Sequence, residues 1–198
     1  MKKICFLIAA TLFCAATYAQ TAKSVLDKAA AHITVKEGVK ANFKMTGSMG
    51  NTSGSILIKG KKFHATTPVA TVWFDGKTQW TYMKNNEEVN VSTPTEAQLQ
   101  AINPYNFINL YKQGYECTLN KTGKSFIVHL VGTSGHKSIK ELFVTIDKQS
   151  YQPTQVKMLT GKKWTIFDIT ELKKERVADS QFRFNPKDFP QAEVIDLR

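Results

Sequence analysis

Short segments that alternate apolar and polar side chains follow one another along most of this sequence, with turn residues between them. The first runs through Ala41, Phe43, Met45 and Gly47. Alternation of this kind is typical of half-buried strands, because successive side chains of a strand point to opposite faces. Further strands are expected at residues 55–59, 62–66, 70–74, 78–83, 88–91, 115–120, 124–131, 138–146, 154–159 and 162–170. Roughly ten antiparallel strands at this spacing predict one large curved sheet or barrel.

Three segments have helical features instead. Residues 21–35 carry apolar side chains at helical spacing, and Gly38 is expected to end this helix. Residues 93–96 resemble a capping box with a proline at the first helical position, which predicts a short helix through Ala101. Asn103-Pro104 predicts the start of another helix at residues 105–112, closed by Gly114. Helices that interrupt such a sheet are expected to cover a face or an open end.

The amino terminus has the plan of a signal peptide. Lys2 and Lys3 precede a short apolar run, and small residues lead up to Ala19. Cleavage after Ala19 would leave a single domain of residues 20–198. Phe13 before Cys14 makes a poor acceptor site for lipid, so the exported chain is expected to be unlipidated. Its one remaining cysteine, Cys117, cannot form an internal disulfide.

The chain carries a net charge of +11, but its basic residues are spread along the sequence. No long basic arm or nucleic-acid motif is present, and export also disfavours nucleic acid as a partner. An anionic membrane face or an acidic partner is the better explanation of the charge.

Motifs for catalysis, cofactors and metals are not found, and we expect no enzyme activity, no cofactor and no bound metal. Residues 122–125 end like a phosphate-binding loop, but Thr118 stands where its opening glycine belongs. Residues 132–135 have the wrong glycine spacing for a nucleophile elbow. The four histidines lie far apart, without a carboxylate or second histidine at a ligand spacing. Cys117 is expected to be a buried, inert thiol.

Large apolar side chains occur on both phases of several strands, as at Trp73-Phe74, Ile166-Phe167 and residues 142–144. A strand with one wet face would alternate, so part of the sheet must have two dry faces. Two explanations remain open. Helices pack on one face and a filled barrel interior lies on the other, or the interior is underfilled and accepts a flexible apolar ligand.

Taken together and in order, these segments resemble the periplasmic outer-membrane lipoprotein carrier family, the LolA-like proteins. The amino-terminal helix leads to Ala41-Asn42-Phe43 and then to the strand at residues 54–59. Residues 72–82, with Asp75-Gly76-Lys77 inside them, resemble the family's hairpin with its aromatic second strand. Residues 103–108 resemble its central helical lid, and residues 182–196 resemble its closing segment. The chain departs at residues 59–63, where the family's lid-holding arginine is missing, and at Ala65, where a tryptophan is usual.

The resemblance implies a mainly β fold, an incomplete and strongly curved antiparallel barrel covered by short helices. It implies a periplasmic, monomeric carrier that holds the acyl chains of lipoproteins in an apolar cavity. Its partners would be acylated lipoproteins, an inner-membrane lipoprotein-releasing transporter and an outer-membrane acceptor. The predicted lid residues are Phe107, Ile108 and Leu110. The predicted cavity residues are Phe43, Met45, Ile56, Ile58, Phe63, Val72, Phe74, Trp80, Tyr82, Leu142, Val144, Met158, Trp164 and Ile166.

Two alternatives are weighed against the carrier. One is a sensor on the same fold that binds a lipid or lipoprotein without delivering it. The other is an exported hydrolase, which the missing catalytic motifs disfavour. Alternation fixes which side chains share a face of the sheet, but it does not fix which face is hollow.

Overall fold

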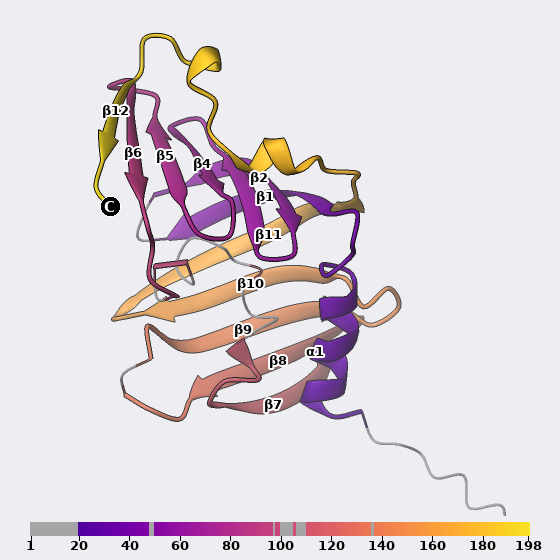
Figure 1. Ribbon diagram of the computed structural model, residues 1–198. Coiled ribbons are helices and arrows are strands. Elements are labelled where there is room, and N and C mark those ends of the chain that lie inside the picture. Colours follow the sequence, from indigo (N-terminus) through magenta and orange to yellow (C-terminus); the bar gives the residue numbers. More distant parts are fainter. Residues whose placement is uncertain (1–19, 48–49, 97, 100–104, 106–109, 136) are drawn as a thin grey trace, which may run out of the picture.

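The computed structural model describes residues 20–47, 50–96, 98–99, 105, 110–135 and 137–198, so the predicted signal peptide lies outside it. Twelve strands within the described residues form one sheet (Figure 1). No helix among these residues is long and apolar enough to cross a membrane. The strands are β1 (Val39–Gly47), β2 (Thr52–Lys59), β3 (Lys62–Thr66), β4 (Ala70–Phe74), β5 (Gln79–Met83), β6 (Glu88–Ser92), β7 (Tyr115–Thr122), β8 (Ser125–Gly132), β9 (Ile139–Asp147), β10 (Pro153–Thr160), β11 (Lys163–Lys174) and β12 (Glu193–Asp196).

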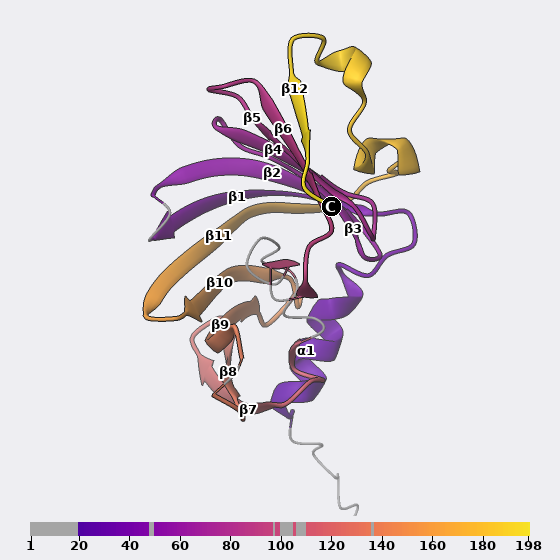
Figure 2. The same ribbon diagram turned by 60° about the vertical axis from the view of Figure 1, so that its left-hand side comes forward.

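The sheet is built mainly from hairpins between consecutive strands. Its order is β12-β6-β5-β4-β3-β2-β1-β11-β10-β9-β8-β7. The edges β12 and β7 do not pair, so the sheet curves strongly without closing (Figure 2). Every segment predicted as a strand is one, and the predicted incomplete, strongly curved barrel is confirmed.

One edge of the sheet differs from the expectation that all strands are antiparallel. β12 was not predicted, and it runs parallel to β6 with Val194 beside Val89. It reaches this edge because residues 177–192 cross the sheet and loop over its end before β12 runs beside β6 (Figure 1). A parallel pair needs such a long connection, whereas antiparallel neighbours such as β4 and β5 can be joined by a short turn.

The helix α1 (Ala22–Ala31) lies against β7 and β8 (Figure 1). Thr21 caps it, because its hydroxyl accepts a hydrogen bond from the Ser24 N–H at 3.1 Å. Val25 and Leu26 are fully buried on the side that faces the sheet.

The end of α1 differs from the prediction, because the helix stops four residues before Val35. Residues 33–35 are β-branched, and such side chains lower helix propensity. Gly38 therefore does not end the helix. It adopts a φ of +113° just before β1, where a Cβ would lie 2.8 Å from the side chain of Val177.

The main core lies between α1 and the face of the sheet turned toward it, which we call the inner face. The opposite side of the sheet is the outer face. On β9, Leu142, Val144 and Ile146 are completely buried at alternate positions. The side chains of α1 and those of β1–β4 and β8–β11 belong to this one cluster. Packing of this cluster fixes which side of the sheet becomes the inside.

A second, smaller core covers the outer face of β3–β6. The segment of residues 177–192, which we call the C-terminal segment, includes the 3₁₀ helices η2 (Asp179–Phe182) and η3 (Pro186–Asp188). Phe182 is fully buried, and the rings of Phe184 and Phe189 lie 5.6 and 5.5 Å from that of Trp73. Asp179 anchors the segment through Lys59 at 3.0 Å and Lys62 at 2.8 Å. This part of the sheet therefore has two dry faces, which explains the adjacent Trp73 and Phe74.

Candidate functional site

Most of the predicted cavity residues share the inner face. Phe63 pairs with Phe74 across β3 and β4, and their ring centroids are 5.4 Å apart. Val144 pairs with Val156 across β9 and β10, and both are completely buried. The predicted residues on this face are Phe43, Met45, Ile56, Ile58, Phe63, Val72, Phe74, Leu142, Val144 and Met158. Contact of any of them with a ligand stays a prediction.

Four predicted cavity residues lie on the outer face, and their assignment to the cavity is wrong. Trp80 pairs with Trp73, and the ring of Tyr82 lies 4.7 Å from that of Phe189 in the C-terminal segment. Trp164 and Ile166 alternate with the inward Thr165 and Phe167 of β11. The physical reason is the two-residue period of a strand: an apolar side chain at the other phase must face the opposite side.

Trp164 of β11 packs within a separate aromatic group on the outer face. The Trp164 ring lies 6.0 Å from Phe143, which stacks on His129 at 4.1 Å. The Lys157 Nζ lies 4.4 Å from the centre of the Trp164 ring. These half-buried side chains cover one another with the help of the lysine stem, which keeps this outer surface from being a bare apolar patch.

A pocket of about 610 Å³ opens on the inner face between the end of α1, strands β2–β4 and the segment after β6. Ile58, Phe63 and Phe74 form its sheet side. Ile33, Leu99, Tyr105 and Leu110 complete the apolar lining. Exposed Lys61, Lys77 and Glu96 border the pocket. An apolar interior with a polar rim suits an apolar group whose other end stays in water.

The predicted lid falls only partly within the described residues. Phe107 and Ile108 lie outside them, so their placement is not addressed. Leu110 is 2% exposed and lines the pocket, together with the equally buried Tyr105. A movement of Leu110 on loading, as the lid prediction requires, stays a prediction.

The helix expected after β6 begins at a different residue. Glu96, Gln98 and Leu99 are helical, and Thr95 rather than Thr93 is the capping residue. The Thr95 N–H donates to Gln98 Oε1 at 2.8 Å, while Gln98 N–H donates to Thr95 Oγ1 at 3.3 Å. This reciprocal pair is a capping box, displaced by two residues from the predicted one. The sequence permits both registers, because each has a threonine followed three residues later by Glu or Gln.

A contact that sequence reasoning missed joins the end of the lid to α1. The Tyr111 hydroxyl donates a hydrogen bond to Asp27 Oδ1, and the Tyr111 side chain is 7% exposed. Burial, then this hydrogen bond and the charge of Asp27, raise the pKa of Tyr111. The phenol therefore stays a donor at neutral pH. This hydrogen bond ties the residue after Leu110 to α1.

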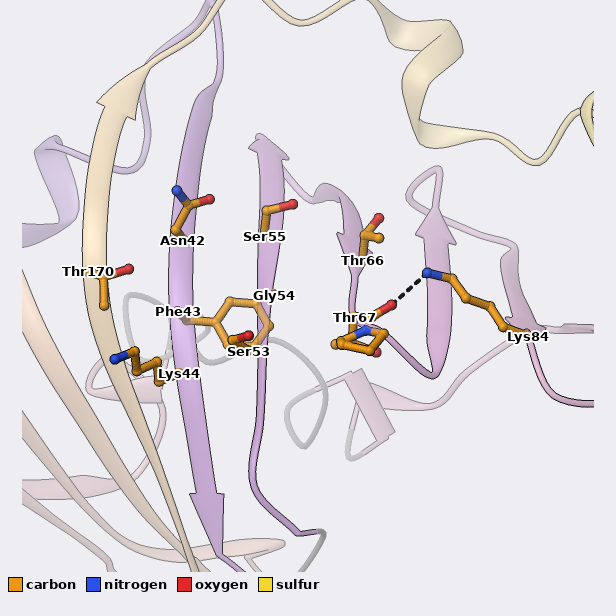
Figure 3. A pocket seen from close by; sticks show the side chains of 11 residues that line it. Asn42, Phe43, Lys44, Ser53, Gly54, Ser55, Thr66, Thr67, Lys84 and Thr170 are labelled. Carbon is orange, nitrogen blue, oxygen red and sulfur yellow. Dashed lines mark hydrogen bonds between the residues drawn. The ribbon is translucent and has the colours of Figure 1, made fainter.

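A second, more polar hollow of about 510 Å³ lies where β1 and β2 meet the turn between β3 and β4 (Figure 3). Its lining includes Asn42, Ser53 and Thr66, and Lys84 Nζ donates to the Thr67 carbonyl at 2.7 Å. The ring of Phe43 lies across Gly54, where a Cβ would be 2.9 Å from its Cζ. Glycine at position 54 thus lets Phe43 reach across β2.

Groups with chemical reactivity are sparse in the described ranges. No three His, Cys, Asp or Glu side chains there are placed to hold a metal ion. Burial raises the pKa of the Cys117 thiol, which favours the protonated and weakly nucleophilic form. His129 Nε2 lies 2.7 Å from Glu141 Oε1 on the outer face, away from the pocket. The pocket is the feature of this fold best suited to a function.

Comparison with solved structures finds similar folds at low sequence identity. An uncharacterized conserved protein from Thermus thermophilus shares 15% identity, with 89% of this chain and 99% of that chain covered and a TM-score of 0.58. A LolA superfamily protein from Nitrosomonas europaea shares 13% identity over 84% of this chain and 99% of that one, with a TM-score of 0.47. A putative outer membrane lipoprotein-sorting protein domain from Vibrio parahaemolyticus shares 12%, over 83% and 94%, with a TM-score of 0.44.

Comparison with curated protein sequences finds no match. A family profile, described as outer membrane lipoprotein carrier protein LolA, matches residues 12–162. This match covers the helix, the lid segment, ten of the twelve strands and the pocket between them. The chain therefore belongs to the family of the outer membrane lipoprotein carrier protein LolA.

Proposed function

We propose that this protein is a periplasmic carrier that holds the acyl chains of lipoproteins in the inner pocket and delivers them to the outer membrane. The observation that carries the proposal is the pocket itself, with Ile58, Phe63, Phe74 and Leu110 inside and charged side chains at the rim. Membership of the lipoprotein carrier family supports a lipoprotein as the cargo.

The energetics of acyl chains explain why such a carrier is needed. Each methylene group costs about 0.8 kcal/mol to expose to water, so a 16-carbon chain costs about 12 kcal/mol. Spontaneous crossing of an aqueous compartment is then negligible. The pocket offers the acyl chain an apolar surface away from water. Its side chains need only move aside when the acyl chain enters and move back when it leaves.

The exchange requires movement of side chains and no covalent chemistry, so in this proposal the protein is not an enzyme. Leu110 and Tyr105 line the pocket, and the hydrogen bond from Tyr111 to Asp27 of α1 holds the residue after Leu110. Cargo that enters must separate these side chains from β2–β4. An inner-membrane lipoprotein-releasing transporter would supply the cargo, and an outer-membrane acceptor would take it.

A displacement titration tests this function. Residues 20–198 are titrated with a hydrophobic fluorescent dye and then with a synthetic palmitoylated lipopeptide, and the same peptide without its acyl chains is the control. We expect about one dye per protein, because one pocket takes it, and displacement by the acylated peptide alone. A protein that unfolds cooperatively but binds neither dye nor lipopeptide has a filled core, and the proposed function would then be wrong.

A further inference from the structure

The inner face is not apolar throughout. On β5 and β6 it carries Gln79, Thr81, Asn90 and Ser92, which we call the polar strip. Their place follows from the register: Gln79 pairs with the inward Phe74 and with Ser92, and Thr81 pairs with the inward Val72 and with Asn90.

Within the strip, Gln79 has an unused hydrogen-bonding atom. The side chain is 9% exposed, and its Nε2 donates to Thr81 Oγ1 at 3.1 Å. Its Oε1 is buried and has no hydrogen-bond partner among the residues that the structure describes. A buried polar atom without a hydrogen-bond partner is unfavourable. A glutamine carbonyl oxygen at such a position is therefore expected to accept a hydrogen bond from a bound ligand.

The strip adjoins the inner pocket. Phe74, the partner of Gln79 on β4, lines the pocket, and so does Thr93, the residue after Ser92. Gln79 is therefore one strand away from the apolar wall that Phe63 and Phe74 give the pocket. The apolar and polar parts of this face match the two parts of an acylated molecule.

We propose that the polar strip binds the amide group at which an acyl chain joins a peptide, with Gln79 as its main contact. This rests on the proposed function and assigns residues of this chain to the amide end of that cargo. One carboxamide complements another, because each has both a donor and an acceptor. An ester has no N–H to donate, and neither does an ionised fatty acid, so neither satisfies the Gln79 carbonyl oxygen.

Three probes with the same 16-carbon chain test this selectivity: an N-palmitoyl peptide, palmitoyl methyl ester and palmitate. Wild-type protein should bind the N-palmitoyl peptide most tightly. Gln79→Leu should weaken that binding about five- to tenfold, as expected for the loss of one buried hydrogen bond, and should leave binding of the ester unchanged. The unfolding midpoint should change little, because the substitution removes the hydrogen bond to Thr81 but also removes an unpartnered buried oxygen.

The matched control is Gln155→Leu, which removes a glutamine on the outer face that donates to Asp168 at 2.7 Å. It should leave the affinity for all three probes unchanged. If Gln79→Leu changes the affinities for the amide and the ester equally, or changes neither, the proposed role of the strip is wrong. The proposed function, binding of an acyl chain, would still stand. Failure of wild-type protein to bind any of the probes would instead overturn the proposed function as well.

Discussion

Phe182→Ala is expected to lower the free energy of unfolding by about 3 to 5 kcal/mol, the range for removing a fully packed phenylalanine. Phe182 is completely buried although it lies in a short 3₁₀ helix far from the main core. The segment that carries it covers Trp73 and brings the chain round to β12. Loss of its packing would expose the outer face of β3–β6 to water and free the edge strand β12.

Denaturant unfolding followed by tryptophan fluorescence measures this loss. Phe182→Leu is the control, because it keeps most of the apolar volume and should recover more than half of the stability. Binding of acyl chains per folded molecule should not change, since Phe182 and the pocket lie on opposite faces of the sheet. A cost below about 1 kcal/mol for Phe182→Ala, well under the typical range, would show that the C-terminal segment is not a true second core.

Ile58→Trp is expected to block the inner pocket and weaken binding of an acyl chain roughly fifty-fold. The larger side chain would displace about three methylene groups of the ligand, each worth about 0.8 kcal/mol. Ile58 is 3% exposed on the inner face and contributes to the pocket lining. Because the added volume enters existing space, the cost in stability should be no more than about 1 to 3 kcal/mol.

The control for this variant makes the same substitution on the other face. Ile166 lies on the outer face of β11, next to the inward Phe167. Ile166→Trp should bind acyl chains like the wild type in an equilibrium titration. If the two variants weaken binding equally, the ligand does not enter the inner pocket, and the pocket is part of the ordinary core.

The positions of the strands could be predicted because turn chemistry is local. Asp75 shows this at the turn between β4 and β5, where its Oδ1 accepts hydrogen bonds from the N–H groups of Lys77 at 3.0 Å and Thr78 at 2.9 Å. Such a turn depends on a few adjacent residues, and the sequence contains all of them. The same holds for the cap of α1 at Thr21.

The face of each strand could not be predicted in the same way. Trp80 and Tyr82 have large aromatic side chains of the kind that line cavities, but the C-terminal segment covers their side of the sheet. That segment lies about a hundred residues further along the chain. The residues around Trp80 do not indicate that it packs on their side of the sheet. The opposite phase of β5 contains Gln79 and Thr81, whose polar side chains give no sign that they face the inside. The predicted Ile58, Phe63 and Phe74 of β2–β4 do line the inner pocket, whereas the predicted residues of β5 and β11 lie on the outer face.

Photo-crosslinking with an acylated peptide tests the central claim most directly, since it reports which residues touch the chain. A palmitoyl lipopeptide with a diazirine at the end of its acyl chain is bound to residues 20–198, irradiated, and the adducts are mapped by mass spectrometry. The pocket predicts saturable adducts on Ile58, Phe63, Phe74 and Leu110, which an unlabelled lipopeptide prevents. Adducts confined to Phe143, Trp164 and Ile166 of the outer face, or no saturable adduct at all, would contradict it.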